Sequence, residues 1–375
     1  MDQLTILHVA PFSQKKASGL STSVPSLVAA QNSIKNTSAG LLVSSGNKST
    51  PSKSQFPLFV EQEVLIHGKM ENLPEPFDKP DLVIFHSTYI PAHLVFSRHL
   101  RKLNIPYIII PHGGMTREAQ SIKKCKKKIA NVLLFNKMVR DALAIQYLSK
   151  GEADKSGFWD QDFIIAGNGV ALPTLESKEE KFEDFSLDFT FIGRLEPYLK
   201  GLDLLIQACS LASVELRQSS SKVRIYGPGS DKNLKMLHTL IADFQVGDVV
   251  EICGPVYDQD KEDVFRQTDV FVHTSRSEGH PMSVLEALSY GVPCLLTPGT
   301  NMSSEVALEG AGWEVELSAD SIAEGIRIAV ASKPNLTEMS KRARRFVEKK
   351  YTWNAVAEKS VGLYRGLLQN RLSNR

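Results

Sequence analysis

Two glutamates, Glu278 and Glu286, stand eight residues apart in the segment SEGHPMSVLEALSYG, on either side of a Gly-His-Pro joint. Pro281 suits the first turn of a helix, and Gly291 can end a helix in the left-handed conformation. We therefore predict a helix across this segment, with Glu278 in the loop ahead of it and Glu286 in its second turn. The two carboxylates are not expected to form a simple surface pair.

The start of this predicted helix could bind a phosphate group. Free N–H groups and the positive end of the helix dipole favour anions. Gly279 permits close approach of the backbone, and the N–H groups near Met282 and Ser283 could receive a phosphate. Glu286 could accept both hydroxyls of a ribose, because a carboxylate has two oxygens, and Glu278 would then lie near a sugar beyond the diphosphate. The alternative is a capped surface helix with two exposed glutamates.

A second segment, FIGRLEPYLKGLDLL, supplies two cations. Arg194 follows a predicted strand directly, and Lys200 comes six residues later, just before a glycine. A guanidinium is a bidentate fork and an ammonium a point charge, and together they suit a diphosphate. The alternative is a pair of solvated surface cations.

Short apolar runs alternate with helical patterns along the whole chain. Near-continuous apolar strands joined by helices are typical of parallel sheets covered on both faces, the α/β class. The predicted strands are 4–10, 39–45, 64–68, 82–87, 107–113, 144–149 and 163–169 in the first half, and 188–194, 222–229, 249–255, 270–275, 293–299 and 312–317 in the second.

Glycine and polar residues follow many of these strands. Ligands bind beyond the carboxyl ends of parallel strands, so these residues are expected on the rims of two sheets that face each other across an interdomain cleft. We expect a first domain at 1–176, a second at 177–350, and a C-terminal helix at 351–375 that packs back toward the first domain.

The composition is that of an ordinary globular protein. The chain has 375 residues, of which 42% are hydrophobic and 23% charged, enough for two domains with their own cores. The formal net charge of +2 gives no nucleic-acid footprint. The cysteines lack metal-ligand spacing, so we expect a reducing, cytoplasmic setting. No DxD-type metal site is visible directly at a strand end near the predicted donor loops, so we predict neither a metal nor another cofactor. The four cysteines are Cys125, Cys209, Cys253 and Cys294.

From Phe191 to about Asn301 the chain resembles the donor half of the family 4 retaining glycosyltransferases of the GT-B fold. The matching motifs are GRLxxxKGxD, GPG, GPV, Glu-x7-Glu and EALSYGVPCLLTPGTN, followed by a C-terminal YTW helix. This resemblance implies two Rossmann-like domains and a nucleotide-diphospho-sugar as co-substrate. It assigns the donor sugar to Glu278, the ribose to Glu286, the diphosphate to Arg194 and Lys200, and the nucleoside also to Gly227 and the backbone around Val256.

The first half resembles the family more loosely. PHGGMTREAQSIKKCKKKIA is similar to a stretch of its bacterial polysaccharide-assembly members. By that match, His112 lies near the anomeric carbon, where it could hydrogen-bond a donor-sugar hydroxyl or stabilise charge; a structural histidine is the alternative. Gly19, a single glycine where the family commonly has two, is expected to open a helix toward the diphosphate.

A basic run lies in the same stretch. Cations close to a membrane surface attract anionic lipid by about 1 kcal/mol each, which would serve a peripheral enzyme with a lipid-linked acceptor; a solvated helix face is an equal alternative. The run comprises Lys123, Lys124, Lys126, Lys127 and Lys128.

These observations predict a retaining, metal-independent glycosyltransferase that builds a surface polysaccharide at the cytoplasmic face of the membrane. Its donor is a nucleotide-sugar, with UDP favoured over GDP, and its acceptor is a glycan or a lipid-linked oligosaccharide. Two other functions stay open: a nucleotide-sugar epimerase of similar two-domain fold, and a non-catalytic glycan-binding or scaffold subunit.

Overall fold

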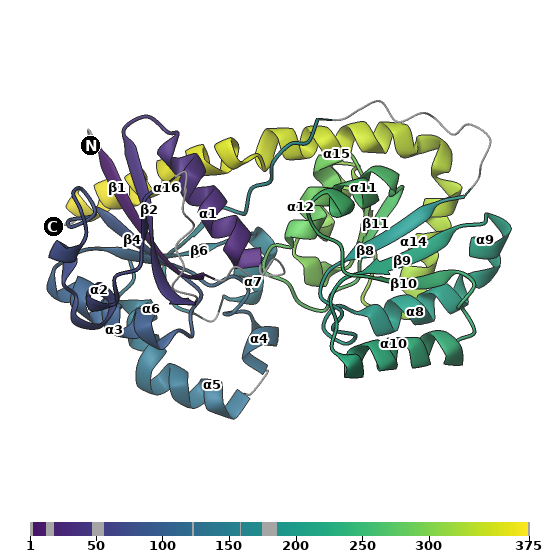
Figure 1. The fold of residues 1–375 in the computed structure, drawn as a ribbon, viewed down its shortest axis with the longest axis horizontal. Coiled ribbons are helices and arrows are strands. Elements are labelled where there is room, and N and C mark those ends of the chain that lie inside the picture. The colour runs from purple at the N-terminus through teal and green to yellow at the C-terminus, as the bar shows by residue number, and fades with distance from the viewer. Residues whose placement is uncertain are drawn as a thin grey trace. The chain divides into compact units, whose positions relative to one another are not determined.

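The computed structural model describes residues 3–12, 19–46, 56–121, 124–157, 159–174 and 186–373. It divides into two compact units (Figure 1). Unit 1 comprises Met1–Gly169 with Trp353–Arg375, and unit 2 comprises Val170–Thr352. Each unit is built on one parallel sheet with helices on both faces. The predicted α/β class with two parallel sheets is confirmed.

The sheet of unit 1 has seven strands in the order β3-β2-β1-β4-β5-β6-β7. Its central strands are buried on both faces, as their continuous apolar runs predict. The strands are β1 (Leu4–Phe12), β2 (Thr37–Gly46), β3 (Leu58–Phe59), β4 (Leu82–His86), β5 (Tyr107–Ile110), β6 (Ala144–Tyr147) and β7 (Phe163–Ile165).

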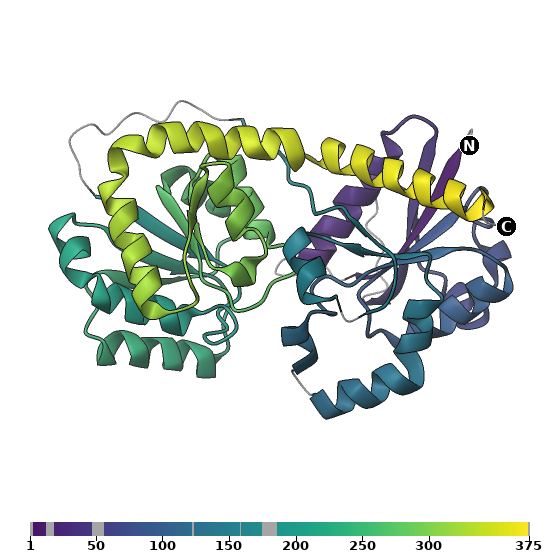
Figure 2. The ribbon, with the colours of Figure 1, turned by 180° about the vertical axis from the view of Figure 1, so that it is seen from behind.

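The helices of unit 1 include the C-terminal helix α16, which packs against α1 (Figure 2). Val361 and Tyr364 of α16 join the same buried cluster as Val24 and Val28 of α1. The helices are α1 (Gly19–Asn32), α2 (Gln62–His67), η1 (Met70–Asn72), α3 (Pro91–Lys102), α4 (Arg117–Ser121), α5 (Lys124–Ala130), the π-helical η2 (Asn131–Phe135), α6 (Asn136–Arg140), α7 (Lys150–Lys155) and α16 (Trp353–Ser373).

The strand predicted at 64–68 is wrong, because this segment ends helix α2. Val64 and Leu65 are buried while Ile66 is half exposed, and the N–H of Gly68 closes the helix on the Val64 carbonyl at 3.0 Å. An apolar run this short fits either period. The edge strand is instead the two-residue β3.

The sheet of unit 2 has six strands in the order β10-β9-β8-β11-β12-β13. The loops after β8 and β11 are therefore neighbours, although β8 and β11 are far apart in the sequence. The strands are β8 (Asp188–Ile192), β9 (Lys222–Tyr226), β10 (Val250–Gly254), β11 (Val270–His273), β12 (Cys294–Leu296) and β13 (Gly312–Glu314).

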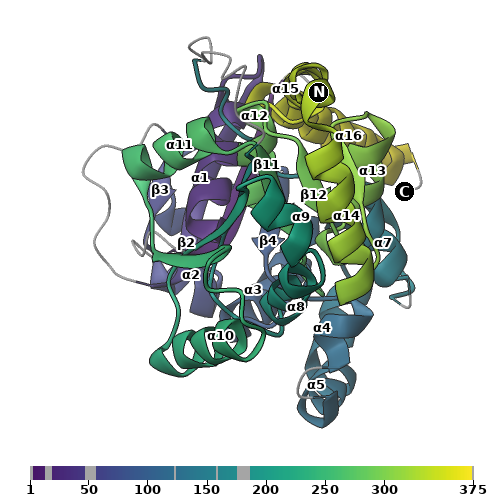
Figure 3. The same cartoon turned by 90° about the vertical axis from the view of Figure 1, so that its right-hand side faces the viewer.

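Helices α8 and α10 lie on one side of this sheet, and α11 and α12 lie on the other (Figures 1 and 3). The helices of unit 2 are α8 (Leu202–Leu211), α9 (Ser213–Gln218), α10 (Asp231–Asp243), α11 (Asp258–Gln267), α12 (Met282–Ser289), η3 (Pro298–Thr300), α13 (Ser303–Leu308), α14 (Ala319–Ala331), η4 (Lys333–Asn335) and α15 (Leu336–Lys350).

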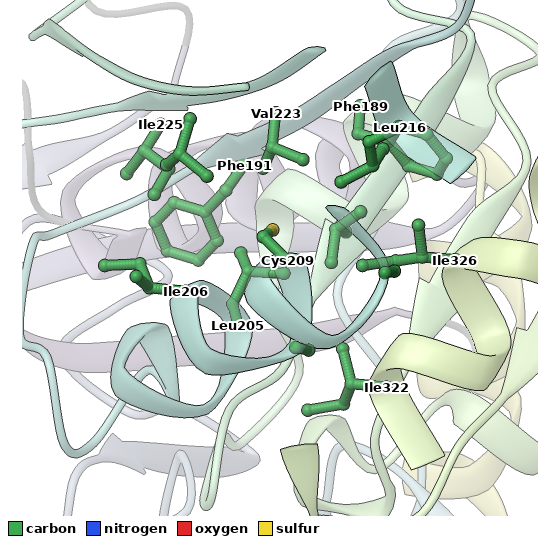
Figure 4. Packing of buried hydrophobic residues seen from close by; sticks show 14 of the residues in the cluster. Phe189, Phe191, Leu205, Ile206, Cys209, Leu216, Val223, Ile225, Ile322 and Ile326 are labelled. Carbon is green, nitrogen blue, oxygen red and sulfur yellow. The ribbon is translucent and has the colours of Figure 1, made fainter. Parts of the chain in front are cut away.

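The largest buried cluster of unit 2 fills the space between its sheet and helices α8 and α14. Phe189 and Phe191 of β8 face Leu205 and Cys209 of α8, with Ile326 of α14 beside them (Figure 4). Full burial of each large apolar side chain contributes about 1.5–3 kcal/mol. This core fixes the end of β8, from which the loop carrying Lys200 begins.

Candidate functional site

Glu278 is the centre of a polar cluster at the carboxyl ends of β8 and β11. Its Oε1 accepts a hydrogen bond from Nε2 of His273 at 2.9 Å and one from Oγ of Ser275 at 2.8 Å. The ammonium of Lys200, from the loop after β8, donates to the same oxygen. Three donors from two neighbouring strand ends therefore hold one carboxylate.

The cluster keeps Glu278 ionised. Burial raises the pKa of Glu278, but the hydrogen bond from His273 and the charge of Lys200 outweigh it and hold this pKa far below its ordinary value. The Lys200 and Glu278 side chains are only 10% and 14% exposed, so solvent screens their attraction little. Burial lowers the pKa of His273 against the opposing effect of Glu278. A neutral His273 donates through Nε2, and none of the described residues hydrogen-bonds its buried Nδ1.

Two glycines bring the backbone of this site together. Gly201 has φ +64°, and a Cβ there would lie 2.0 Å from the carbonyl oxygen of Thr274. A Cβ on Gly299, in the loop after β12, would lie 1.9 Å from the carbonyl oxygen of Ser275. The carbonyl of Gly299 also accepts from the N–H of Glu278 at 2.8 Å. Only glycine permits these approaches, which explains the Lys-Gly and Pro-Gly pairs in the sequence.

Helix α12 agrees with its prediction. It begins at Met282 after Pro281, so Glu278 lies in the preceding loop and Glu286 in the second turn. Gly291 takes φ +72°, the predicted left-handed conformation. Oε2 of Glu286 accepts from Nζ of Lys261, in α11, at 2.5 Å. Sequence reasoning missed Lys261, since one lysine in the acidic run DQDKED gives no signal.

The structure does not bring Arg194 into the Glu278 cluster. Its side chain is 57% exposed and pairs with Glu196 at 2.8 Å. Lys200 joins the cluster, whereas the sequence had suggested two similar cations. Gly279, Met282 and Ser283 follow Glu278 directly and begin α12; their binding to a diphosphate remains a prediction.

Glycines allow the backbones of the loops after β8, β9 and β10 to make close contact. The N–H of Gly227 donates to the carbonyl of Gly254 at 2.8 Å. A Cβ on Gly227, at φ +147°, would lie 1.7 Å from the carbonyl oxygen of Gly193. Val256, two residues after Gly254, packs against a buried apolar cluster of unit 2. Gly227 and Val256 thus lie at the ends of adjacent strands, and their nucleoside-binding role stays a prediction.

His112 of unit 1 belongs to a row of hydrogen-bonded imidazoles. Its Nε2 lies 3.0 Å from Nδ1 of His86, and Nε2 of His86 lies 2.9 Å from Nδ1 of His8. Burial lowers the pKa of His112 and of His8 to about 4, and burial likewise lowers that of His86 well below its usual range. Sequence reasoning singled out His112 alone; the strand-ending His86 shows the same signal.

A buried glutamate, also missed, holds the loop that follows His112. Oε1 of Glu152 accepts from the N–H of Gly113 at 2.5 Å, and Oε2 from the N–H of Leu148 at 2.7 Å. Burial raises the pKa of Glu152 to about 7, against the effect of these two bonds. Its sequence context, SKGEADK, is that of an ordinary surface helix.

A small pocket of unit 1 includes His112. Gly19 begins α1 as predicted, and α1 supplies one wall of the pocket; residues 13–18 of the same loop lie outside the described part of the chain. The lining residues are Ser23, Val24, Leu27, His86, Ile110, His112, Gln146, Leu148, Gly167 and Asn168.

Most of the basic run lies in α5, at the edge of unit 1 (Figure 1). Lys127 is used within the unit, because its Nζ donates to the Ala119 carbonyl at 2.5 Å and lies 5.4 Å from the centre of the Tyr89 ring. Lys123 lies outside the described residues. The exposed lysines of α5 are Lys124, Lys126 and Lys128.

Across the described ranges, no three or more His, Cys, Asp and Glu side chains form a group that could hold a metal ion. Within the same ranges, none of the helices combines the length and apolar character needed to cross a bilayer.

Comparisons with known proteins show similarity to glycosyltransferases. Residues 174–346 match the family described as glycosyl transferases group 1. WcaL of Escherichia coli (strain K12), provisionally named a colanic acid biosynthesis glycosyltransferase, is 27% identical over 235 residues, which are 60% of this chain and 56% of that protein. The D-inositol 3-phosphate glycosyltransferase of Kineococcus radiotolerans is 26% identical over 49% of this chain and 45% of its own. The chain thus spans about half the length of these relatives.

Solved structures match nearly the whole chain. A glycosyltransferase from Rickettsia africae ESF-5 has a TM-score of 0.71 and 17% identity, covering 99% of this chain and 100% of that one. Anabaena Alr3699/HepE, in complex with UDP and glucose, has a TM-score of 0.70 and 15% identity, covering 97% and 100%. The predicted GT-B fold is confirmed.

Proposed function

Because residues 174–346 match the glycosyl transferases group 1 family, we propose that this chain is a retaining glycosyltransferase that uses a nucleotide-diphospho-sugar. The observation that carries the proposal is the ionised carboxylate of Glu278, held by Lys200 and His273 at the carboxyl end of β11. In open parallel sheets ligands bind at this edge, and a buried carboxylate kept ionised beside a cation is typical of functional sites.

Unit 2 holds the donor in this proposal. Glu278 contacts the donor sugar, and Glu286 accepts the ribose hydroxyls, with Lys261 orienting its carboxylate at 2.5 Å. Gly19 and His112 of unit 1 keep their predicted roles, toward the diphosphate and the reacting sugar. The other donor contacts are Arg194, Lys200, Gly279, Met282 and Ser283 for the diphosphate, and Gly227 and Val256 for the nucleoside.

The chemistry requires charge stabilisation more than a strong base. The acceptor hydroxyl oxygen attacks the anomeric carbon on the face that the diphosphate leaves, which retains the configuration. The bond from that carbon to the diphosphate breaks, and the departing diphosphate takes the hydroxyl proton. Cations and the N–H groups at the start of α12 stabilise the charge that builds on the leaving group; loss of one such preorganised group costs roughly 10²–10³ in rate.

The direct test is transfer by the purified chain. A panel of UDP- and GDP-sugars is first screened for thermal stabilisation, since a ligand at about 100 times its Kd adds about 2.7 kcal/mol. Turnover of the best donor is then compared with that of Glu278→Gln and of the control Glu316→Gln, an exposed residue of unit 2. We expect a loss of about 10²–10³ in kcat for the first and no change for the second. Equal turnover of Glu278→Gln and the wild type would remove Glu278 from the mechanism.

The same assay separates the rival functions. An epimerase would release a changed sugar nucleotide without any acceptor, and a non-catalytic subunit would neither transfer nor hydrolyse the donor. We also propose that transfer needs no metal. Activity after exhaustive chelation tests this, and a complete loss that added metal restores would contradict it.

We propose surface-polysaccharide assembly at the cytoplasmic face of the membrane as the setting. The support is the name of WcaL, which refers to colanic acid biosynthesis, together with the basic run. A UDP-sugar is favoured over a GDP-sugar because a structure of the same fold, Alr3699/HepE, is described in complex with UDP and glucose.

The exposed surface of α5 and η2 supports attachment to an anionic membrane. Lysines are followed by apolar side chains that are 61–71% exposed, an arrangement that suits insertion at a lipid headgroup boundary. Replacing the three exposed lysines by Ser should abolish sedimentation with anionic vesicles at low salt, and binding that persists equally on neutral vesicles would contradict the electrostatic account. The residues concerned are Lys124, Lys126 and Lys128, with Ile129, Val132 and Leu133.

A further inference from the structure

His112 is the end of a chain of hydrogen bonds that begins at a backbone carbonyl in α16. Oγ of Ser360 donates to the Ala357 carbonyl at 3.0 Å. Ser360 therefore accepts from Nε2 of Gln31, also at 3.0 Å, and this turns the amide oxygen of Gln31 toward His8. Oε1 of Gln31 lies 2.8 Å from Nε2 of His8. An amide oxygen only accepts, so Nε2 of His8 carries a hydrogen.

The same reasoning passes from ring to ring. A neutral imidazole has one N–H and one acceptor nitrogen. Since Nε2 of His8 donates, its Nδ1 accepts from Nε2 of His86 at 2.9 Å. Nδ1 of His86 must then accept from Nε2 of His112 at 3.0 Å. Every link has one hydrogen, and all three rings take the Nε2–H form.

The rings are also held firmly in place. The His8 and His86 rings have centroids 5.2 Å apart and an interplanar angle of 26°. Those of His86 and His112 are 5.2 Å apart at 31°. His8 is fully buried and His86 is 1% exposed, so water does not compete for these bonds. A hydrogen bond in such a buried site is stronger than one in water, and a polar group left there without its partner costs more free energy.

We propose that His8 and His86 are positioning residues that fix His112 in its Nε2–H form, so that Nδ1 of His112 accepts a hydrogen bond from a hydroxyl of the sugar substrate. None of the described residues hydrogen-bonds this Nδ1, and His112 lines the pocket of unit 1. His112 then recognises a group that donates, such as a hydroxyl, and does not offer a proton itself. The inference rests on the proposed sugar transfer for its ligand, but the tautomer is a property of the protein alone.

The experiment is a ¹H–¹⁵N correlation spectrum of the whole chain with ¹⁵N-labelled histidine, which distinguishes the two tautomers of each ring. At pH 7.5 we expect His8, His86 and His112 to be neutral with Nε2 protonated. A His112 ring protonated at Nδ1, or a mixture of both forms, would overturn the proposal. This spectrum requires neither a substrate nor a variant of the protein.

Two variants of nearly equal size test the link to turnover. In His86→Asn the amide oxygen takes the place of Nδ1 and still accepts from His112, whereas His86→Leu offers no acceptor. We expect His86→Leu to lose the single tautomer of His112 and about tenfold in kcat with little change in KM, the effect of one oriented hydrogen bond. We expect His86→Asn to keep the Nε2–H signal and most of the turnover. His67→Asn, at an exposed position of unit 1, is the control.

The outcomes separate this inference from the proposed function. Equal tautomers and equal kcat in the Asn and Leu variants would overturn the role of His86. If His86→Leu fails to fold, the wild-type spectrum and the Asn variant still decide. If the chain transfers no sugar but shows the Nε2–H form throughout, the proposed function fails while the hydrogen-bond chain stands.

Discussion

In unit 2 charged and polar partners hold the side chain of Glu278, whereas in unit 1 neutral imidazole rings hold the side chain of His112. Glu278 is ionised between Lys200 and His273, while His112 is kept uncharged by burial and tied to two further imidazoles. An ionised carboxylate accepts hydrogen bonds from sugar hydroxyls, and so does the acceptor nitrogen of a neutral imidazole. In the proposed function the two units therefore offer the sugar different acceptors, one charged and one neutral.

The largest effect is expected from breaking the buried ion pair of unit 2. Removing one partner of such a pair destabilises by about 3–5 kcal/mol, because a buried charge loses its partner. Lys200→Met should lower the free energy of unfolding of unit 2 by this amount, measured by hydrogen exchange of the β11 amides. Arg217→Met is the matched control, since the Arg217–Asp248 pair is about half exposed and contributes about 0–1 kcal/mol. Equal losses in both variants would deny the special role of the Glu278 cluster.

The same ion pair makes the stability of unit 2 depend on pH in the acid range. The folded-state pKa of Glu278 lies below the unfolded value of 4.5, so the unfolded state binds more protons in this range. The stabilisation is fully present above about pH 4.5 and is lost as the pH falls further. We expect the stability of unit 2 to fall more steeply below pH 4.5 in the wild type than in Glu278→Gln. Parallel pH curves for the two proteins would contradict this account.

Glu152 makes the stability of unit 1 depend on pH in the opposite direction. Its folded-state pKa of about 7 lies above the unfolded value of 4.5, so the folded state binds more protons between these values. The stability of unit 1 should therefore decrease as the pH rises from 4.5 to 7, by about 3 kcal/mol, and then level off.

Glu152→Gln should flatten this slope, as read from hydrogen exchange in β5 and β6. Asp154→Asn, on the exposed side of the same helix α7, should leave it unchanged. If the slope survives in Glu152→Gln, another group of unit 1 titrates in this range.

Local sequence patterns predicted most of the fold and part of the site. Continuous apolar runs identified nearly all the strands, and the Gly-x-Pro joint placed Glu278 and Glu286 correctly around the start of α12. The strand predicted at 64–68 was wrong because two buried residues do not distinguish a strand from a helix. The capping role of Gly68 would have been the better signal.

The contacts that define the site depend on strand order, which no local pattern contains. Lys200 meets Glu278 because β8 and β11 are neighbours in the sheet, and Lys261 meets Glu286 because α11 and α12 share one side of it. The row from His8 to His112 likewise depends on three adjacent strands, because His8 lies within β1, His86 ends β4 and His112 follows β5. Arg194 shows the converse, since its place at a strand end did not bring it to Glu278.

Nucleotide binding tests the central claim most directly. Titration calorimetry of the whole chain with UDP and with GDP should give a measurable Kd for one of them. Glu286→Gln should weaken that nucleotide about tenfold, because the ribose loses a charge-assisted hydrogen bond. The account predicts this loss together with unchanged binding by Glu316→Gln. Failure of both nucleotides to bind, or equal affinity for the wild type and Glu286→Gln, would contradict it.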